Sequence, residues 1–195
     1  MTQSVEFINV ADENIQDCFR RVVEQYTPLA GHRMVLCQKK IGKTTMQAQP
    51  IINQKFWNRK RREYRVDCNH QTQVDDPTRL ENLPTDVLEG WLAHEVGHVM
   101  DYHSRGWFNL IWLGIQYLIN SKRKREAEHQ ADLYAIEYGF AEKILATKRY
   151  ILDHSDIAEA YKERIRKYYM TPEDVERAIL TQDKPILGVD DAKVL

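Results

Sequence analysis

A short motif in the middle of the chain has the residue types and spacing of a metal site. In H-E-V-G-H, His94 and His98 are four residues apart, and Glu95 follows the first histidine. Because an α-helix turns every 3.6 residues, both imidazoles lie on one face, one turn apart. Two neutral imidazoles at this separation can bind one metal ion, and the adjacent carboxylate can move a proton. The motif therefore predicts a metal centre with a general base.

A catalytic zinc ion needs a third protein ligand and an open position for water. We predict Glu128 as this ligand, because it opens the motif E-H-Q-A-D on the next strongly helical segment. Asp132 lies one turn further along the same face, and we expect it to accept the N–H of His94 or His98 and so fix the tautomer of that ring.

Two neighbours of Glu128 are alternative ligands. His129 is the first alternative and Glu126 the second, and His129 points to a different helical face from Asp132. A solvated charged face is the competing interpretation of this segment, because R-K-R-E-A-E-H surrounds the glutamate. The small residues Gly97 and Ala131 would let the two helices approach closely at the ion.

These residues predict hydrolysis by a metal-activated water. One Zn²⁺ per chain would acidify its bound water and polarise a carbonyl group, and Glu95 would take the proton of that water. Retention of Glu95 favours catalysis, because a structural site needs ligands but no base. The candidates for stabilising an oxyanion are Tyr102, His103, His154, Tyr161 and Arg164.

The two motifs resemble those of the gluzincin peptidases. The greatest similarity is to the minigluzincins, soluble relatives of the catalytic domains of integral-membrane CAAX prenyl proteases and bacterial heat-shock proteases. The resemblance rests on residues 83–98 and 128–132 and extends over about 34–169. It implies a zincin-like zinc endopeptidase. The alternative is a latent or inactive zinc-binding relative that acts as a regulatory or binding module.

Two further segments bear on this resemblance. Residues 44–50 are similar to the upper-rim strand of the family, which implies that Met46, Gln47, Ala48 and Gln49 pair with an extended peptide or protein substrate. Glu163-Arg164-Ile165 matches a family triplet, but Ala158 stands where the family has a histidine. The family's oxyanion role therefore does not transfer to this chain.

The surrounding segments predict an α+β fold with an N-terminal helix, a small three-stranded sheet, the helix of H-E-V-G-H and a helical C-terminal half. We expect one domain over 1–180. The tail, 181–195, is expected either to be disordered or to fold back along the cleft. The predicted helices are 12–26, one that begins at Pro84, 122–138, 141–153, 155–169 and 172–180, and the predicted strands are 34–41, 43–52 and 63–68, with a turn at Gly42.

The most apolar run of the chain is 106–120, and its central part is Trp107–Ile119. As a helix it would span about 20 Å, against roughly 30 Å of bilayer hydrocarbon, so it cannot cross a membrane. We expect a helix that is buried on nearly all sides. The alternative is weak contact with a membrane surface, helped by the basic residues 122–125.

Composition and charge favour a soluble globular protein. The chain has 195 residues, 43% of them hydrophobic, and a net charge of −1. This charge argues against a nucleic-acid partner, so we interpret the basic clusters 59–62 and 122–125 as solvated, the first of them in a loop or hairpin tip. Cys18, Cys37 and Cys68 are odd in number and widely spaced, which favours reduced, buried thiols. We expect a cytoplasmic protein, with membrane association as a variant, and predict no oligomeric state.

Overall fold

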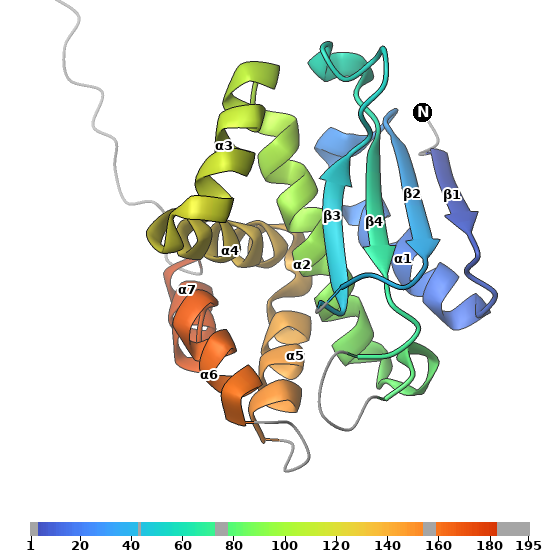
Figure 1. Cartoon of the computed structure of the whole chain (residues 1–195). Coiled ribbons are helices and arrows are strands. Elements are labelled where there is room, and N and C mark those ends of the chain that lie inside the picture. The colour runs from blue at the N-terminus through green and yellow to red at the C-terminus, as the bar shows by residue number, and fades with distance from the viewer. Residues whose placement is uncertain (1–3, 43, 73–77, 154–158, 183–195) are drawn as a thin grey trace, which may run out of the picture.

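The computed structural model describes residues 4–42, 44–72, 78–153 and 159–182. It has a mixed α+β architecture in which a four-stranded sheet lies beside a mostly helical C-terminal half (Figure 1). The strands are β1 (Ser4–Ile8), β2 (Arg33–Gln38), β3 (Met46–Pro50) and β4 (Tyr64–Cys68). The helices are α1 (Glu13–Gln25), α2 (Thr85–Ser104), α3 (Trp107–Ile119), α4 (Ser121–Ala135), α5 (Ala141–Asp153), α6 (Glu159–Tyr168) and α7 (Pro172–Gln182).

The sheet differs from the expected one in size and in order. Its strand order is β1-β2-β4-β3, with β1, β2 and β4 parallel and β3 antiparallel to β4. The prediction of three strands was therefore wrong by one. Val5 and Phe7 of β1 alternate with polar residues, but five residues are a weak signal beside a chain terminus. The segment around Gly42 also joins no hairpin, because β4 lies between β2 and β3 and leaves β3 at the edge.

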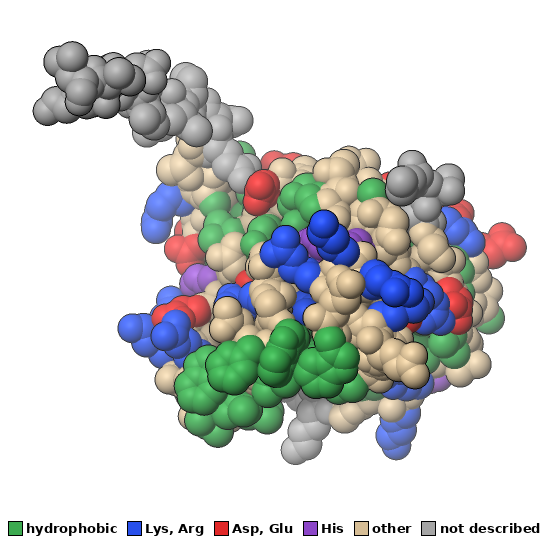
Figure 2. Space-filling view, turned by 90° about the horizontal axis from the view of Figure 1, so that it is seen from above, with side chains coloured by type: hydrophobic (Ala, Val, Ile, Leu, Met, Phe, Trp, Pro, Cys, Tyr) green, Lys and Arg blue, Asp and Glu red, His purple; other side chains and the backbone are tan. Residues whose placement is uncertain are grey.

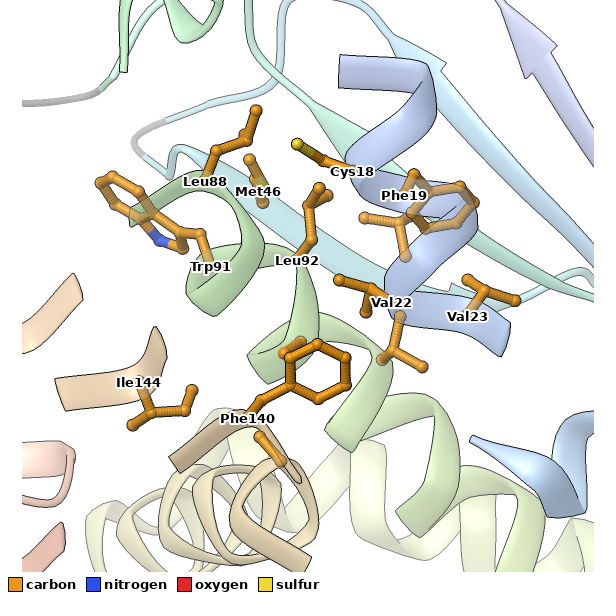
Figure 3. Close-up of a cluster of buried hydrophobic side chains, with 14 of the residues drawn as sticks. Cys18, Phe19, Val22, Val23, Met46, Leu88, Trp91, Leu92, Phe140 and Ile144 are labelled. Carbon is orange, nitrogen blue, oxygen red and sulfur yellow. The ribbon is translucent and has the colours of Figure 1, made fainter. Parts of the chain in front are cut away.

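Helix α1 covers the sheet and forms the core together with α2. It begins where the Asp12 side chain accepts a hydrogen bond from the N–H of Ile15. Its buried residues recur at helical spacing, as the sequence predicts. Figure 3 shows the side chains of α1 meeting Leu88 and Leu92 of α2 and Met46 of β3. All three cysteines are free and buried, as expected.

Helix α2 is the central element of the molecule, in contact with α1, β3, α4 and α5. Residues 87–101 are all buried. Two glycines allow the close packing: a Cβ on Gly97 would lie 2.3 Å from the carbonyl oxygen of Ala131 in α4, and one on Gly90 would lie 2.2 Å from the carbonyl oxygen of Lys143 in α5. The close approach predicted for Gly97 and Ala131 is therefore present.

Helix α3 contradicts the expectation of a buried helix. Leu110 is its one buried residue, whereas Phe108 is 68% and Leu118 83% exposed. The physical reason is that α3 projects from the body of the protein and has α4 as its main neighbour (Figure 1). In the part of the chain that the structure describes, no helix is both long enough and apolar enough to span a membrane.

The C-terminal helices follow the predicted order with shifted ends. Helix α4 passes through a π-helical turn, Ile136–Phe140, in which Gly139 has a φ of 89°. This left-handed conformation suits glycine and allows the chain to turn into α5. The helix expected over 155–169 is described from Glu159 on, and most of the tail predicted to be disordered or cleft-blocking lies outside the described residues.

Candidate metal centre

Helix α2 places three polar side chains in the interior of the protein. His94, Glu95 and His98 are each less than one tenth exposed. The two imidazole rings lie on one face, with their centroids 4.8 Å apart. They are buried because α2 is covered on several sides, and its apolar residues are part of the core. Buried groups of this kind require polar partners or an ion.

Helix α4 brings the third side chain to this face. Glu128 Oε2 lies 3.2 Å from His94 Nε2 and 3.3 Å from His98 Nε2, and the three ligand atoms are within 4.8 Å of one another. A tetrahedral ion with bonds of about 2.0–2.2 Å places neighbouring ligand atoms about 3.3–3.6 Å apart. The buried group of His94, His98 and Glu128 could therefore bind a metal ion.

The two alternative ligands lie elsewhere. The ring of His129 lies against Arg125, with 3.4 Å between His129 Nε2 and Arg125 Nε. Glu126 is exposed and forms an ion pair with Arg123. The solvated-face interpretation fits these outer residues of α4, but it does not fit Glu128, which is 1% exposed.

Asp132 contacts the other ring nitrogen of His94. Its Oδ1 lies 2.8 Å from His94 Nδ1, which leaves Nε2 directed at Glu128. This contact orients the ring so that Nε2 can donate a lone pair to an ion once its proton is lost. Burial opposes a charge on His94, but the carboxylates of Asp132 and Glu128 outweigh it and raise the pKa of His94 to about 10.

Lys148 of α5 supplies the charge that balances Asp132. Its Nζ lies 2.8 Å from Asp132 Oδ2, which also accepts the backbone N–H of Met170 at 3.3 Å. Burial would raise the pKa of Asp132, but Lys148 and His94 lower it to about 2. The sequence offered no signal for this role of Lys148, because a lysine on an amphipathic helix is ordinarily solvated.

Glu95 lies beside the proposed ligands and faces the edge strand. Burial raises its pKa above the ordinary value, and the neighbouring histidines oppose this rise. Its carboxylate also forms a hydrogen bond with the backbone of Ala48 in β3. A raised pKa is suited to a carboxylate that takes up and returns a proton near neutrality.

Two tyrosines lie next to the candidate metal centre although no sequence motif indicated them. The Tyr117 hydroxyl of α3 donates a hydrogen bond to Glu128 Oε1. The ring of Tyr169 lies against that of His94, with 5.4 Å between the centroids. Tyr117 belongs to the apolar run, where a tyrosine is expected to be one more core residue. The helical spacing of apolar residues therefore could not indicate that its hydroxyl contacts a carboxylate.

A groove of about 670 Å³ opens at Glu95, His98 and Glu128. One wall is β3 and the opposite wall is α3, with Leu110, Leu113 and Gly114 among its lining residues. The polar edge of β3 is turned toward α2: the Tyr102 hydroxyl donates to the Ala48 carbonyl at 3.4 Å.

Residues 46–49 divide between the two faces of the sheet. Met46 and Ala48 pack toward the core, whereas the amides of Gln47 and Gln49 reach Asp67, at 3.4 and 2.6 Å. The four predicted substrate-strand residues thus line the groove through β3, but the glutamine side chains contact Asp67 of β4.

The oxyanion candidates are spread over the molecule. Tyr102 and Arg164 line the groove, and Tyr161 lines a smaller neighbouring cavity of about 40 Å³. His103 lies instead beside Tyr64 and His32, with its ring 4.7 Å from that of His32. His154 lies outside the described residues.

The chain was compared with protein-family models, curated proteins and solved structures. No protein-family model, no curated protein and no solved structure matches the chain.

Proposed function

We propose that this protein is a zinc-dependent endopeptidase. The observation that carries the proposal is the spacing of 3.2 and 3.3 Å between Glu128 and the two imidazoles, at the base of a groove bounded by an edge strand. Two imidazoles and one carboxylate form a ligand set that suits catalytic zinc. When bound there, zinc supplies an acidified water and polarises the carbonyl group of the substrate.

The protein's own residues account for the remaining steps. Glu95 accepts the proton of the attacking water and delivers it to the leaving amine. Asp132 holds His94 in the tautomer that directs Nε2 to the ion, and Lys148 keeps Asp132 charged. Arg164 and Tyr102 line the groove and are the candidates for stabilising the oxyanion.

An extended peptide is the substrate that fits the groove. Edge strands recognise such peptides through main-chain hydrogen bonds. In this structure the Ala48 carbonyl accepts from Tyr102, and the Ala48 backbone contacts Glu95. A peptide paired with β3 would replace these two contacts and release Glu95 for proton transfer.

The test combines metal analysis with peptide cleavage. We expect one zinc per purified chain and cleavage of a quenched-fluorescence peptide library at neutral pH. Glu95→Gln should keep the zinc and lower kcat/KM by about 10²–10⁴, since general-base catalysis contributes that much. Glu128→Gln should lower the zinc content. Glu126→Gln, an exposed residue on the same helix, is the matched control and should change neither.

Two results would contradict the proposal. Full activity in Glu95→Gln would remove the catalytic role of this residue and point to a contaminating protease. Stoichiometric zinc without cleavage of any peptide would favour the alternative, a zinc-binding regulatory or binding module.

A further inference from the structure

The exposed side of α3 and the tip of the loop between β3 and β4 form one apolar surface, which we call the α3 face. Its most prominent residues are Trp57, Trp107, Phe108, Trp112, Leu118 and Ile119, all of them exposed. The two segments are in contact, since the rings of Trp57 and Trp107 lie 5.1 Å apart. Figure 2 shows a continuous apolar patch with Lys and Arg side chains at its borders.

Hydrogen bonds join the loop tip to the end of α2 and to the connection that leads into α3. The buried Arg62 donates from Nη1 to the carbonyls of Tyr102 at 2.8 Å and Arg105 at 3.1 Å. Arg59 donates to the carbonyl of Ser104 at 3.3 Å. Arg62 is thus a structural residue, although the sequence suggested a solvated loop throughout 59–62. The apolar surface is preformed, because neither segment has to move to create it.

The segments that form the α3 face carry basic residues and no acidic one, and the acidic residue that follows the second of them in the sequence, Glu126, pairs with Arg123. Residues 51–62 and 105–125 contain no Asp or Glu, whereas Arg59, Lys60 and Arg61 lie at one end and residues 122–125 at the other. Within the described residues, Lys60, Lys122 and Lys124 take part in no ion pair with an acidic side chain. The whole chain has a net charge of −1, so this basic surface is a local asymmetry.

We propose that the α3 face docks the protein on an anionic membrane surface. Exposed Trp, Phe and Leu side chains flanked by Lys and Arg are the composition of elements that lie in the interfacial plane of a bilayer. The apolar side chains enter the headgroup boundary, while the basic residues meet acidic lipid headgroups. Helix α3 is 13 residues long, which suits lying in this plane and is too short for crossing.

Charge also decides between a membrane and a second copy of the chain. A symmetric dimer through the α3 face would bring basic clusters from both copies to the same contact, where like charges repel. An anionic bilayer complements both clusters at once. The groove opens beside the same helix, since Leu110 and Leu113 line it, so docking would place the groove near the lipid surface.

Vesicle co-sedimentation of the full chain tests the proposal. We expect binding to equimolar phosphatidylcholine and phosphatidylserine vesicles, weakened by salt, and much weaker binding to phosphatidylcholine alone. Phe108→Gln/Trp112→Gln should weaken binding roughly tenfold, because both side chains are exposed and neither lines the groove. Lys60→Gln/Lys122→Gln should weaken it about 25-fold at low salt, at about fivefold per charge.

Matched controls change similar residues on the C-terminal helices. Leu180→Gln removes an exposed apolar side chain of α7, and Arg149→Gln/Arg177→Gln removes two exposed charges. Both should bind as the unaltered chain does, and thermal melts should show that every variant folds.

Three results would overturn the proposal. The first is no binding of the unaltered chain to the anionic vesicles. The second is unchanged binding after Phe108→Gln/Trp112→Gln. The third is a dimer in light scattering that this double variant converts to a monomer, because a second copy would then cover the α3 face.

Discussion

Helices α2 and α3 follow one another in the chain and have opposite relations between composition and burial. Helix α2 carries six acidic or histidine side chains between Asp86 and Asp101, yet residues 87–101 are buried. Helix α3 has no charged residue, yet Leu110 is its one buried side chain. The more polar helix lies in the centre, and the more apolar one projects from the surface (Figure 1).

Whether a helix is buried here depends on the elements that pack around it rather than on its own composition. The polar groups of α2 are tolerated because they are paired: Glu89 with Arg21, Asp101 with Arg105, and His94 with Asp132. Helix α3 lacks a covering layer. A large apolar patch left exposed in this way marks an interaction surface.

The largest effect is expected from breaking the buried ion pair between Lys148 and Asp132, which tests whether ion pairs stabilise the polar interior around α2. Lys148→Met should lower the free energy of unfolding by about 3–5 kcal/mol, because the buried Asp132 loses its cationic partner. Chemical denaturation measures this change. In the double variant Lys148→Met/Asp132→Asn most of the loss should be recovered, whereas zinc affinity should fall about 10–100-fold.

Arg149→Met is the control for this experiment. Arg149 is the next residue on α5, and its ion pair with Glu176 is exposed, so the expected loss is below about 1 kcal/mol. An equal loss of unfolding free energy in Lys148→Met and Arg149→Met would contradict the view that burial determines how much an ion pair contributes to stability.

The second expected effect concerns the packing of α2 on α4. Gly97→Ala should lower the free energy of unfolding by about 1–3 kcal/mol, because the added Cβ would lie 2.3 Å from the carbonyl oxygen of Ala131 and α4 must shift. The zinc content should fall as well, since Glu128 lies one turn before Ala131 on the shifted helix. Thermal melts and metal analysis of one sample would show both; a variant with unchanged stability and zinc content would rule out this close contact.

The smallest effect has the opposite sign and comes from α3. Gly114→Ala should stabilise the protein by about 0.5–1 kcal/mol, because nothing lies within 4 Å of the added methyl group and alanine favours the helix. Denaturant titrations of Gly114→Ala and Gly97→Ala under the same conditions compare their free energies of unfolding. Destabilisation by Gly114→Ala would mean that α3 is covered in solution, and the comparison between the helices would fail.

Residue spacing was sufficient to predict the residues of the candidate metal centre, but not the residues that contact them from other helices. The motif H-E-V-G-H and the motif E-H-Q-A-D already contain His94, His98, Glu128 and Asp132, because helical periodicity sets which side chains share a face. Tyr117 and Lys148 reach the centre from other helices. No local pattern encodes contacts of this kind, since they depend on how whole helices pack.

The α+β class, the main helices and a group of residues able to hold an ion could be predicted from the amino-acid pattern, because each depends on periodicity within one or two segments. Two features became visible only in the folded chain: the place of β4 between β2 and β3, and the exposure of α3. The physical reason is that strand order and burial depend on contacts between distant segments, and apolar composition measures only the tendency of a helix to be covered.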